Sequence, residues 1–340
     1  MENRITNKRI YLFDNIKFFL ITTVVVGHFA EVGTSKSEIY KSIFVFIYAF
    51  HMPLFLFISG IFHKNRNVTQ KIVMFVSLGF LSKIILYIMK MIVNGKASFS
   101  LLSDSYLPWY MFVMAMFTAV SWFLRNTDKR FVLVVAIILA CVAGYDNNVG
   151  DYLYLSRFIV FYPFFVLGEM TTKETILQLN RNKTIKVIAL GVIVLWLLIC
   201  FTKLDSVYML RPLFTGRNPF SINELFEKWG FLYRFICYII TFLTSFSILC
   251  LIPDINIPYI SKMGARTLQV YFWHWPIALI LKKIGLQSVL LETSHGKLLW
   301  LLIAVALTFL LSVEIFSFPT KAVAQFSKQR VSKKINSKEK

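Results

Sequence analysis

The chain has 340 residues, of which 57% are hydrophobic and only 16% are charged, and its formal net charge is +20. A soluble domain is typically about 45–50% hydrophobic and about 25% charged, so the composition excludes a soluble globule. Apolar runs of about 20 residues, the length that crosses a hydrocarbon core, recur along the whole chain. They are too long and too uniformly apolar for alternating barrel strands. The sequence therefore predicts an all-α, polytopic helical bundle in a membrane.

About ten segments are expected to cross the membrane. The first carries Asp14 and Lys17 and has no small-residue cleavage site at its end, unlike a secretory signal, so it counts as a helix of the mature bundle. In chain order the expected spans are 10–30, 39–62, 72–93, 107–124, 130–144, 152–170, 184–202, 231–252, 267–285 and 297–318.

The basic residues predict the orientation of these spans. Lys and Arg are retained on the cytoplasmic side, and an inward N-terminus gives the inner segments about three times as many of them as the outer loops. Both termini are therefore expected in the cytoplasm, in a multi-pass protein of the cell membrane. The chain divides into one membrane domain over 1–318 and a basic cytoplasmic tail over 319–340, which would attract anionic lipids. No aromatic-basic binding pattern accompanies the charge, so nucleic acid is not an expected partner.

The first span holds ionisable residues at membrane depth, where each costs about 2.5–3.5 kcal/mol on insertion scales. Lys17 and His28 are eleven positions apart, which places them on one helix face, about 16 Å from each other. Asp14 lies three positions before Lys17 and can pair with it. In one interpretation Lys17 snorkels and His28 bonds a neighbouring helix. In the other, Lys17 holds an anion near the cytoplasm and His28 acts as a base.

Further along the chain, His51 is expected near the middle of the second span, either in a structural hydrogen bond or beside His28. Arg157 is expected near the outer start of the sixth span, where snorkelling is one explanation. The long outer connection over 203–230 contains Ser221 and Glu224 at the spacing of a capping box, which predicts a short helix before the eighth span.

Five sequence blocks then occur in a fixed order: 12–17 with 27–28, 50–60, 107–110, 156–168, and 264–274. Together they resemble the membrane acyltransferase-3 family, and within it the branch of fucose 4-O-acetylases and nodulation-factor acetyltransferases. Lys17 stands where many members carry arginine, which keeps the charge but loses the bidentate fork. The connection over 63–71 departs from relatives that carry paired arginines there, which leaves the identity of the donor phosphate ligands open.

The resemblance implies a membrane O-acyltransferase that moves an acyl group, acetyl in the first instance, from cytoplasmic acetyl-coenzyme A to a hydroxyl of an envelope polysaccharide. His28 corresponds to the essential histidine, and no metal is expected. The expected catalytic residues are His28, Lys17, Asp14 and Arg157. The expected donor-binding residues are Lys17, Lys64, Arg66, Lys71 and Arg266, and the expected acceptor-binding residues are Arg157, His51 and Trp109.

Other possibilities stay open at this stage. The bundle could be a polysaccharide exporter that transfers no acyl group, although no pair of Gly/Pro-broken helices in matching halves points to alternating access. His274 is expected to be a packing residue. The acceptor sugar, the acyl group, a direct or acyl-histidine route and the oligomeric state are left undecided by the residues.

Overall fold

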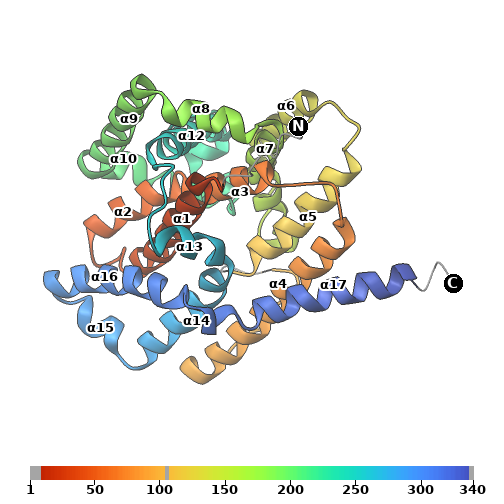
Figure 1. Cartoon of the computed structure of the whole chain (residues 1–340). Helices are drawn as coiled ribbons and strands as arrows, with labels where there is room; N and C mark the ends of the chain where they lie inside the picture. Colours follow the sequence, from red (N-terminus) through yellow and green to blue (C-terminus); the bar gives the residue numbers. More distant parts are fainter. Residues whose placement is uncertain (1–8, 104–106, 337–340) are drawn as a thin grey trace.

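The computed structural model describes residues 9–103 and 107–336, and within these residues it is helical, with no β-strand. The expected all-α architecture is thus confirmed (Figure 1). The longer helices are α1 (Tyr11–Val32), α2 (Glu38–Tyr48), α3 (His51–Ile61), α4 (Val68–Asn94), α5 (Trp109–Phe123), α6 (Lys129–Val142), α7 (Leu155–Met170), α9 (Lys183–Thr202), α12 (Glu224–Leu251), α14 (Thr267–Lys283), α16 (Ser294–Leu311) and α17 (Thr320–Asn336). The shorter ones are α8 (Lys173–Arg181), α10 (Leu204–Tyr208), α11 (Arg211–Phe214), α13 (Ile260–Met263) and α15 (Leu286–Leu290).

Seven helices of the described chain are long and apolar enough to cross a membrane, where the sequence predicts about ten. Three of the ten expected spans correspond to shorter helices, α5, α6 and α14, of 15, 14 and 17 residues. Ten crossings, and the cytoplasmic placement of both termini, therefore remain predictions. The seven candidates are Tyr11–Val32, Glu38–Ile61, Val68–Asn94, Tyr152–Met170, Lys183–Thr202, Glu224–Leu251 and Ser294–Leu311.

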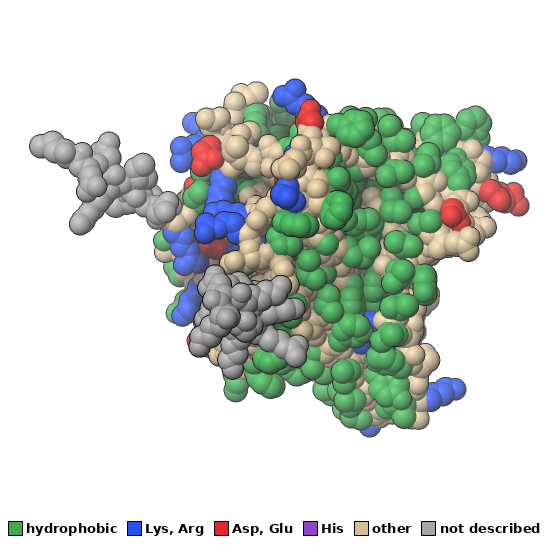
Figure 2. Space-filling model, turned by 90° about the vertical axis from the view of Figure 1, so that its right-hand side faces the viewer, with side chains coloured by type: hydrophobic (Ala, Val, Ile, Leu, Met, Phe, Trp, Pro, Cys, Tyr) green, Lys and Arg blue, Asp and Glu red, His purple; other side chains and the backbone are tan. Residues whose placement is uncertain are grey.

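The surface of the bundle carries large exposed hydrophobic side chains, among them Val187 and Leu195 on α9 and Phe235 and Phe242 on α12. Figure 2 shows hydrophobic side chains over most of one face, with Lys and Arg gathered toward its left-hand edge. Soluble monomers rarely expose contiguous apolar surfaces of this kind. The chain is therefore a membrane protein, with these helix faces turned to lipid.

The second expected span is not one continuous helix. Residues Ala49 and Phe50 separate α2 from α3, and Phe50 has φ −132° and ψ −30°. Pro53 explains the break, because proline has no N–H to bond the carbonyl four positions earlier and suits the first turn of a new helix. His51 consequently begins α3, while it still lies near the middle of the candidate span Glu38–Ile61, as expected.

Glycines allow two close backbone approaches that position the bundle. A Cβ on Gly168 of α7 would lie 2.0 Å from the carbonyl oxygen of Phe57 on α3, and one on Gly60 would lie 2.2 Å from the carbonyl oxygen of Phe165. Small residues let membrane helices approach this closely. Near the N-terminal end of α1, a Cβ on Gly264 would lie 1.9 Å from the backbone oxygen of Asp14.

Helix α1 lies near the middle of the bundle, in contact with α2, α3, α13, α14 and α16 (Figure 1). Its neighbours thus come from both ends of the sequence. Basic helix α17, within the expected tail, runs beside α4 and also contacts α14.

The connection over 203–223 folds into α10, α11 and a short 3₁₀ helix, Phe220–Ile222. The next helix, α12, begins at Glu224 and has a non-helical residue, Trp229, at φ −122° and ψ 23°. A short helical segment does precede the expected start at 231. Its cap is Asn223 rather than Ser221, because the Asn223 side chain accepts the N–H of Leu225 at 2.9 Å.

Candidate functional site

A cavity of about 330 Å³ lies at the C-terminal end of α1. Its wall comes from α1, α2, α3, α5, α7 and α14, and it is closed on one side by residues 211–222 of the long connection. The polar residues in the wall are His28, Glu31, Tyr48, His51, Trp109, Arg157, Arg211, Thr215, Arg217, Asn218 and Tyr271. Four residues predicted from the sequence, His28, His51, Trp109 and Arg157, are therefore together in one cavity.

His28 faces a carboxylate from its own helix. Its Nδ1 is 3.6 Å from Oε2 of Glu31, one turn further along α1. Tyr48 donates its hydroxyl to the same Oε2 at 3.1 Å, and Arg211 approaches Oε1 at 3.3 Å. Since a proton on Nδ1 is favoured by the facing carboxylate, the other ring nitrogen, Nε2, is left to accept a proton. This arrangement can serve a general base.

Two further histidines lie near His28, and each is held by a backbone carbonyl of its own helix. Nδ1 of His51 lies 2.9 Å from the carbonyl oxygen of Ile47, and Nδ1 of His274 lies 3.0 Å from that of Val270. A carbonyl can only accept, so the Nδ1 of each ring donates to it. The rings of His274 and Trp275 each lie 5.4 Å from that of His28, between centroids. His274 is completely buried and lies outside the cavity wall.

Arg157 forms the deep polar part of the wall, with its side chain only 6% exposed. Its guanidinium carbon lies 4.8 Å from the ring centre of Trp109, and Nη1 lies 3.6 Å from Asp151 Oδ1. Arg217 bonds the other oxygen of the same carboxylate at 2.6 Å. Asp151 therefore holds two of the cavity's arginines in place.

The segment that closes the cavity is fixed by side chains from two other helices. Ser156 at the start of α7 donates its hydroxyl to the carbonyl oxygen of Gly216 at 2.8 Å, and the buried Arg234 of α12 bonds that of Leu213. Because these bonds hold the backbone directly, the arginines of the segment are presented in a defined geometry.

A second cavity, of about 200 Å³, lies further toward the N-terminal end of α1 and contains Lys17. It shares Val24, Met52 and Tyr271 with the first cavity. These three side chains thus line both the Lys17 end and the His28 end. The two cavities therefore approach each other along one face of α1, the face on which the sequence places both residues.

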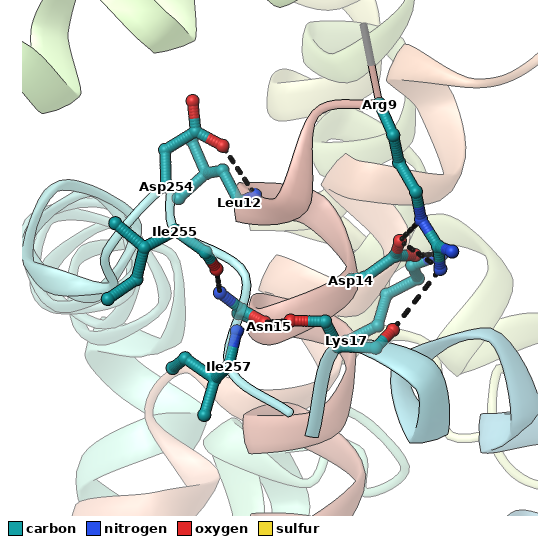
Figure 3. A network of polar contacts seen from close by, with 9 residues as sticks. Arg9, Leu12, Asp14, Asn15, Lys17, Asp254, Ile255 and Ile257 are labelled. Carbon is teal, nitrogen blue, oxygen red and sulfur yellow. Dashed lines mark hydrogen bonds and ion pairs between the residues drawn. The ribbon is translucent and has the colours of Figure 1, made fainter. Parts of the chain in front are cut away.

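The N-terminal end of α1 is held by a polar network (Figure 3). Asp14 pairs with Lys17 at 3.0 Å, as its spacing predicts, and with Arg9 at 2.8 Å. The neighbouring Asn15 is buried and donates to the carbonyl oxygens of Pro253 at 3.0 Å and Ile255 at 2.9 Å. Asp14 is fourteen positions from His28, or about 21 Å along the helix, so it lies away from the histidine cavity.

The remaining residues expected to bind the donor lie outside both cavity walls. Lys64 and Arg66 are exposed in the connection before α4, and Lys71 bonds the carbonyl oxygen of Lys64 at 2.5 Å. Arg266 pairs with Glu314 at 3.3 Å, although its neighbour Thr267 lines the Lys17 cavity. Lys17 is thus the one expected donor ligand in a cavity wall among the described residues.

Sequence reasoning missed several residues of the histidine cavity. Glu31 resembles an ordinary charge at the end of a helix, although its position three residues after His28 is a usable signal. Tyr48 lies in an aromatic-rich helix with nothing to distinguish it, whereas Tyr271 falls in the sequence block 264–274 but was given no role. Arg211 and Arg217 lie in a connection without periodicity, whose fold could not be predicted from local pattern.

Comparison with known families gives one result that covers most of the chain. Residues 10–317 match the acyltransferase domain of the acyltransferase-3 family. No curated protein and no solved structure matches the chain. The family match runs from α1 past the end of α16, and His28, the histidine that the resemblance singles out, lies in a polar cavity. The chain therefore belongs to the acyltransferase-3 family of membrane acyltransferases.

Proposed function

We propose that the protein is an O-acyltransferase of the cell membrane that moves an acetyl or similar short acyl group from cytoplasmic acyl-coenzyme A to a hydroxyl of an envelope polysaccharide. The observation that carries this proposal is the pair of cavities along α1, one at Lys17 and one at His28, which share Val24, Met52 and Tyr271. A donor and an acceptor can then approach one wall from opposite ends.

Lys17 is the proposed contact for the donor. Coenzyme A carries several phosphate charges, which favour a cation at the mouth of its site. With both termini in the cytoplasm, as the basic residues predict, the Lys17 end of α1 lies toward the compartment that supplies the donor. The thin pantetheine arm would then lie along the face of α1 toward His28, about 16 Å away. Lys64, Arg66, Lys71 and Arg266 would add positive charge to the surroundings of this mouth rather than line it.

His28 is the proposed general base. Its Nε2 accepts the proton of the acceptor hydroxyl while that oxygen forms a bond to the thioester carbon. The carbon–sulfur bond then breaks, and the histidine returns the proton to the departing thiolate. The negative charge of Glu31, 3.6 Å from Nδ1, favours a proton on that nitrogen and so leaves Nε2 to accept. Arg157 is the proposed group that stabilises negative charge on the carbonyl oxygen, because a fixed cation in a buried wall acts strongly there.

The test uses purified protein in liposomes supplied with radiolabelled acetyl-coenzyme A and envelope glycan. We expect acetyl transfer by the unaltered protein and a loss of about 10²–10⁴-fold in His28→Ala. His295→Ala alters an exposed histidine away from both cavities and should transfer normally. Near-normal transfer by a folded His28→Ala protein would refute this mechanism. Glycan movement across the membrane without any acetyl transfer would favour an exporter instead.

Withholding the acceptor separates two routes of transfer. A direct attack leaves the protein unlabelled, whereas a two-step route accumulates label on His28. His51 is the other histidine in the cavity wall, and its Nδ1 already donates to the carbonyl oxygen of Ile47. If His28→Ala still accumulates label, His51 is the residue to replace next.

A further inference from the structure

We infer that the acceptor is an acidic sugar, whose carboxylate or phosphate group binds Arg211 and Arg217 while its hydroxyl lies at His28. The inference rests on the proposed function for the identity of the histidine cavity as the acceptor site. It adds the chemical class of the acceptor, which neither the fold nor the family match supplies.

The wall is strongly cationic. Among the residues that the structure describes, Arg157, Arg211 and Arg217 line the cavity, and Glu31 is the one carboxylate that does so. Asp151 lies behind the wall and contacts two of these arginines. Within the described part of the chain, the printed ion pairs of the wall thus bring three guanidinium groups and two carboxylates together. A bound anion would place negative charge opposite these arginines, whereas a neutral sugar would remove water from them without replacing it by charge.

Arg211 is the most accessible of the three. Its side chain is 38% exposed, and its ion pair with Glu31 is long, at 3.3 Å. The guanidinium also lies over the ring of Phe44, 5.1 Å from the ring centre, which fixes its plane. Arginine carries five N–H donors in a planar fork that fits two oxygens of a carboxylate or phosphate. A second acceptor can therefore bind Arg211 without breaking its contact with Glu31.

Arg217 supports the same ligand from the same connection. It lies six residues after Arg211, and its side chain is about one-third exposed while Asp151 holds its Nη2 at 2.6 Å. The backbone between the two arginines is fixed by Ser156 and Arg234, through the carbonyl oxygens of Gly216 and Leu213. Because both arginines are held in place before any ligand arrives, little ordering of the chain is needed for binding.

The anion subsite and the base belong to one ionic network. Glu31 contacts Arg211 through Oε1 and faces His28 through Oε2. The acidic group and the reacting hydroxyl are thus recognised on either side of a single carboxylate. We therefore expect both groups to be substituents of one sugar unit.

Binding can be tested with three small probes that share one ring: glucose, glucuronate and glucose 6-phosphate. The full chain is reconstituted in nanodiscs of phosphatidylcholine, and the rise in unfolding temperature is measured against probe concentration. We expect both acids to stabilise the protein and glucose to do so at least tenfold more weakly. Arg211→Gln should weaken binding of the acids about tenfold or more, and Arg211→Lys should recover part of it. Arg181→Gln, at an exposed arginine on α8 outside the cavity, is the matched control.

Several results would overturn the inference. Equal stabilisation by glucose and by the acids would do so, as would unchanged acid binding in both Arg211→Gln and Arg217→Gln. Using two variants guards against one that does not fold, and the unfolding temperature without probe reports folding directly. If the acids do not stabilise the protein in phosphatidylcholine, while phosphatidylglycerol raises the unfolding temperature of the unaltered protein but not of Arg211→Gln, the arginines bind a lipid headgroup and an acidic sugar is excluded.

The acyl-transfer assay separates this inference from the proposed function. Efficient transfer from acetyl-coenzyme A to a neutral glycan, in preference to acidic ones, would overturn the acidic acceptor and leave the acyltransferase intact. Acid binding that depends on Arg211, with no transfer to any acceptor, would overturn the acyltransferase activity and leave the acid-binding site intact.

Discussion

His28 and Glu31 lie one turn apart on α1, with the imidazole Nδ1 3.6 Å from the carboxylate Oε2. Glu31 also accepts the hydroxyl of Tyr48 and pairs with Arg211, so its orientation is set from three helices. The carboxylate is therefore positioned to orient the histidine rather than to react.

Glu31→Gln keeps the size of this side chain and removes its charge. We expect kcat to fall at least about tenfold, less than the 10²–10⁴-fold expected for loss of the base itself. The KM for acetyl-coenzyme A should be unchanged, because the donor binds at the other end of α1. Steady-state kinetics in liposomes measure both constants. Glu38→Gln, at an exposed residue of α2, is the matched control, and an equal fall of kcat in both variants would contradict a positioning role for Glu31.

Lys17 is expected to act on the donor. Lys17→Ala should raise the KM for acetyl-coenzyme A, since a cation near the coenzyme phosphates is lost, while Lys17→Arg should restore most of the affinity. Titration of the donor at saturating acceptor provides the measurement. Lys262→Ala removes an exposed charge on α13, outside the cavity wall, and should behave normally. An unchanged donor KM in Lys17→Ala would make Lys17 a structural partner of Asp14.

The close contact between α3 and α7 predicts that the same substitution, glycine to alanine, lowers stability at Gly168 but not at Gly191. Gly168→Ala places a Cβ 2.0 Å from the carbonyl oxygen of Phe57, so the helices must move apart, at a cost of about 1–3 kcal/mol. Gly191→Ala on α9 meets nothing within 4 Å and should be neutral or slightly stabilising. Thermal unfolding in one detergent compares the two. Equal unfolding temperatures would show that the α3–α7 contact is not tight.

His63 predicts a response to pH in the connection between α3 and α4. Burial lowers the pKa of His63 from 6.5, although Asn65 and Glu169 act in the opposite direction. A histidine with a lowered pKa in the folded state takes up its proton more readily when unfolded. Its contribution to stability is therefore full above about pH 6.5 and is lost as the pH falls below that value. Unfolding temperatures between pH 8 and pH 5 should fall more steeply in the unaltered protein than in His63→Asn. His295→Asn, at an exposed position, should leave the slope unchanged.

The parts of the fold that follow from local pattern could be predicted from the sequence. The first apolar run predicts a span over 10–30, and the observed helix is Tyr11–Val32. The eleven-residue spacing places Lys17 and His28 on one face of that helix. The Asp14–Lys17 pair follows from helical geometry in the same way. The break before His51 was missed because hydrophobicity is continuous across it, although Pro53 is the residue that marks it.

The parts of the site that depend on tertiary folding could not be predicted. Arg211 and Arg217 reach the cavity because Ser156 and Arg234 hold the backbone of their connection. Asn15 has no distinctive local signal, yet it joins α1 to the segment after α12. Such contacts join residues that are far apart in the sequence, where neither periodicity nor spacing carries information.

The position of α1 has a consequence for how the protein is made. Its partners α13, α14 and α16 leave the ribosome more than 200 residues after α1, which at about 5–20 residues per second is on the order of ten to fifty seconds. During that interval the nascent chain holds His28 and Glu31 without the helix that carries His274 and Trp275. The site is therefore assembled only when the last quarter of the chain enters the bundle, so an interrupted synthesis product carries the histidine without its finished pocket.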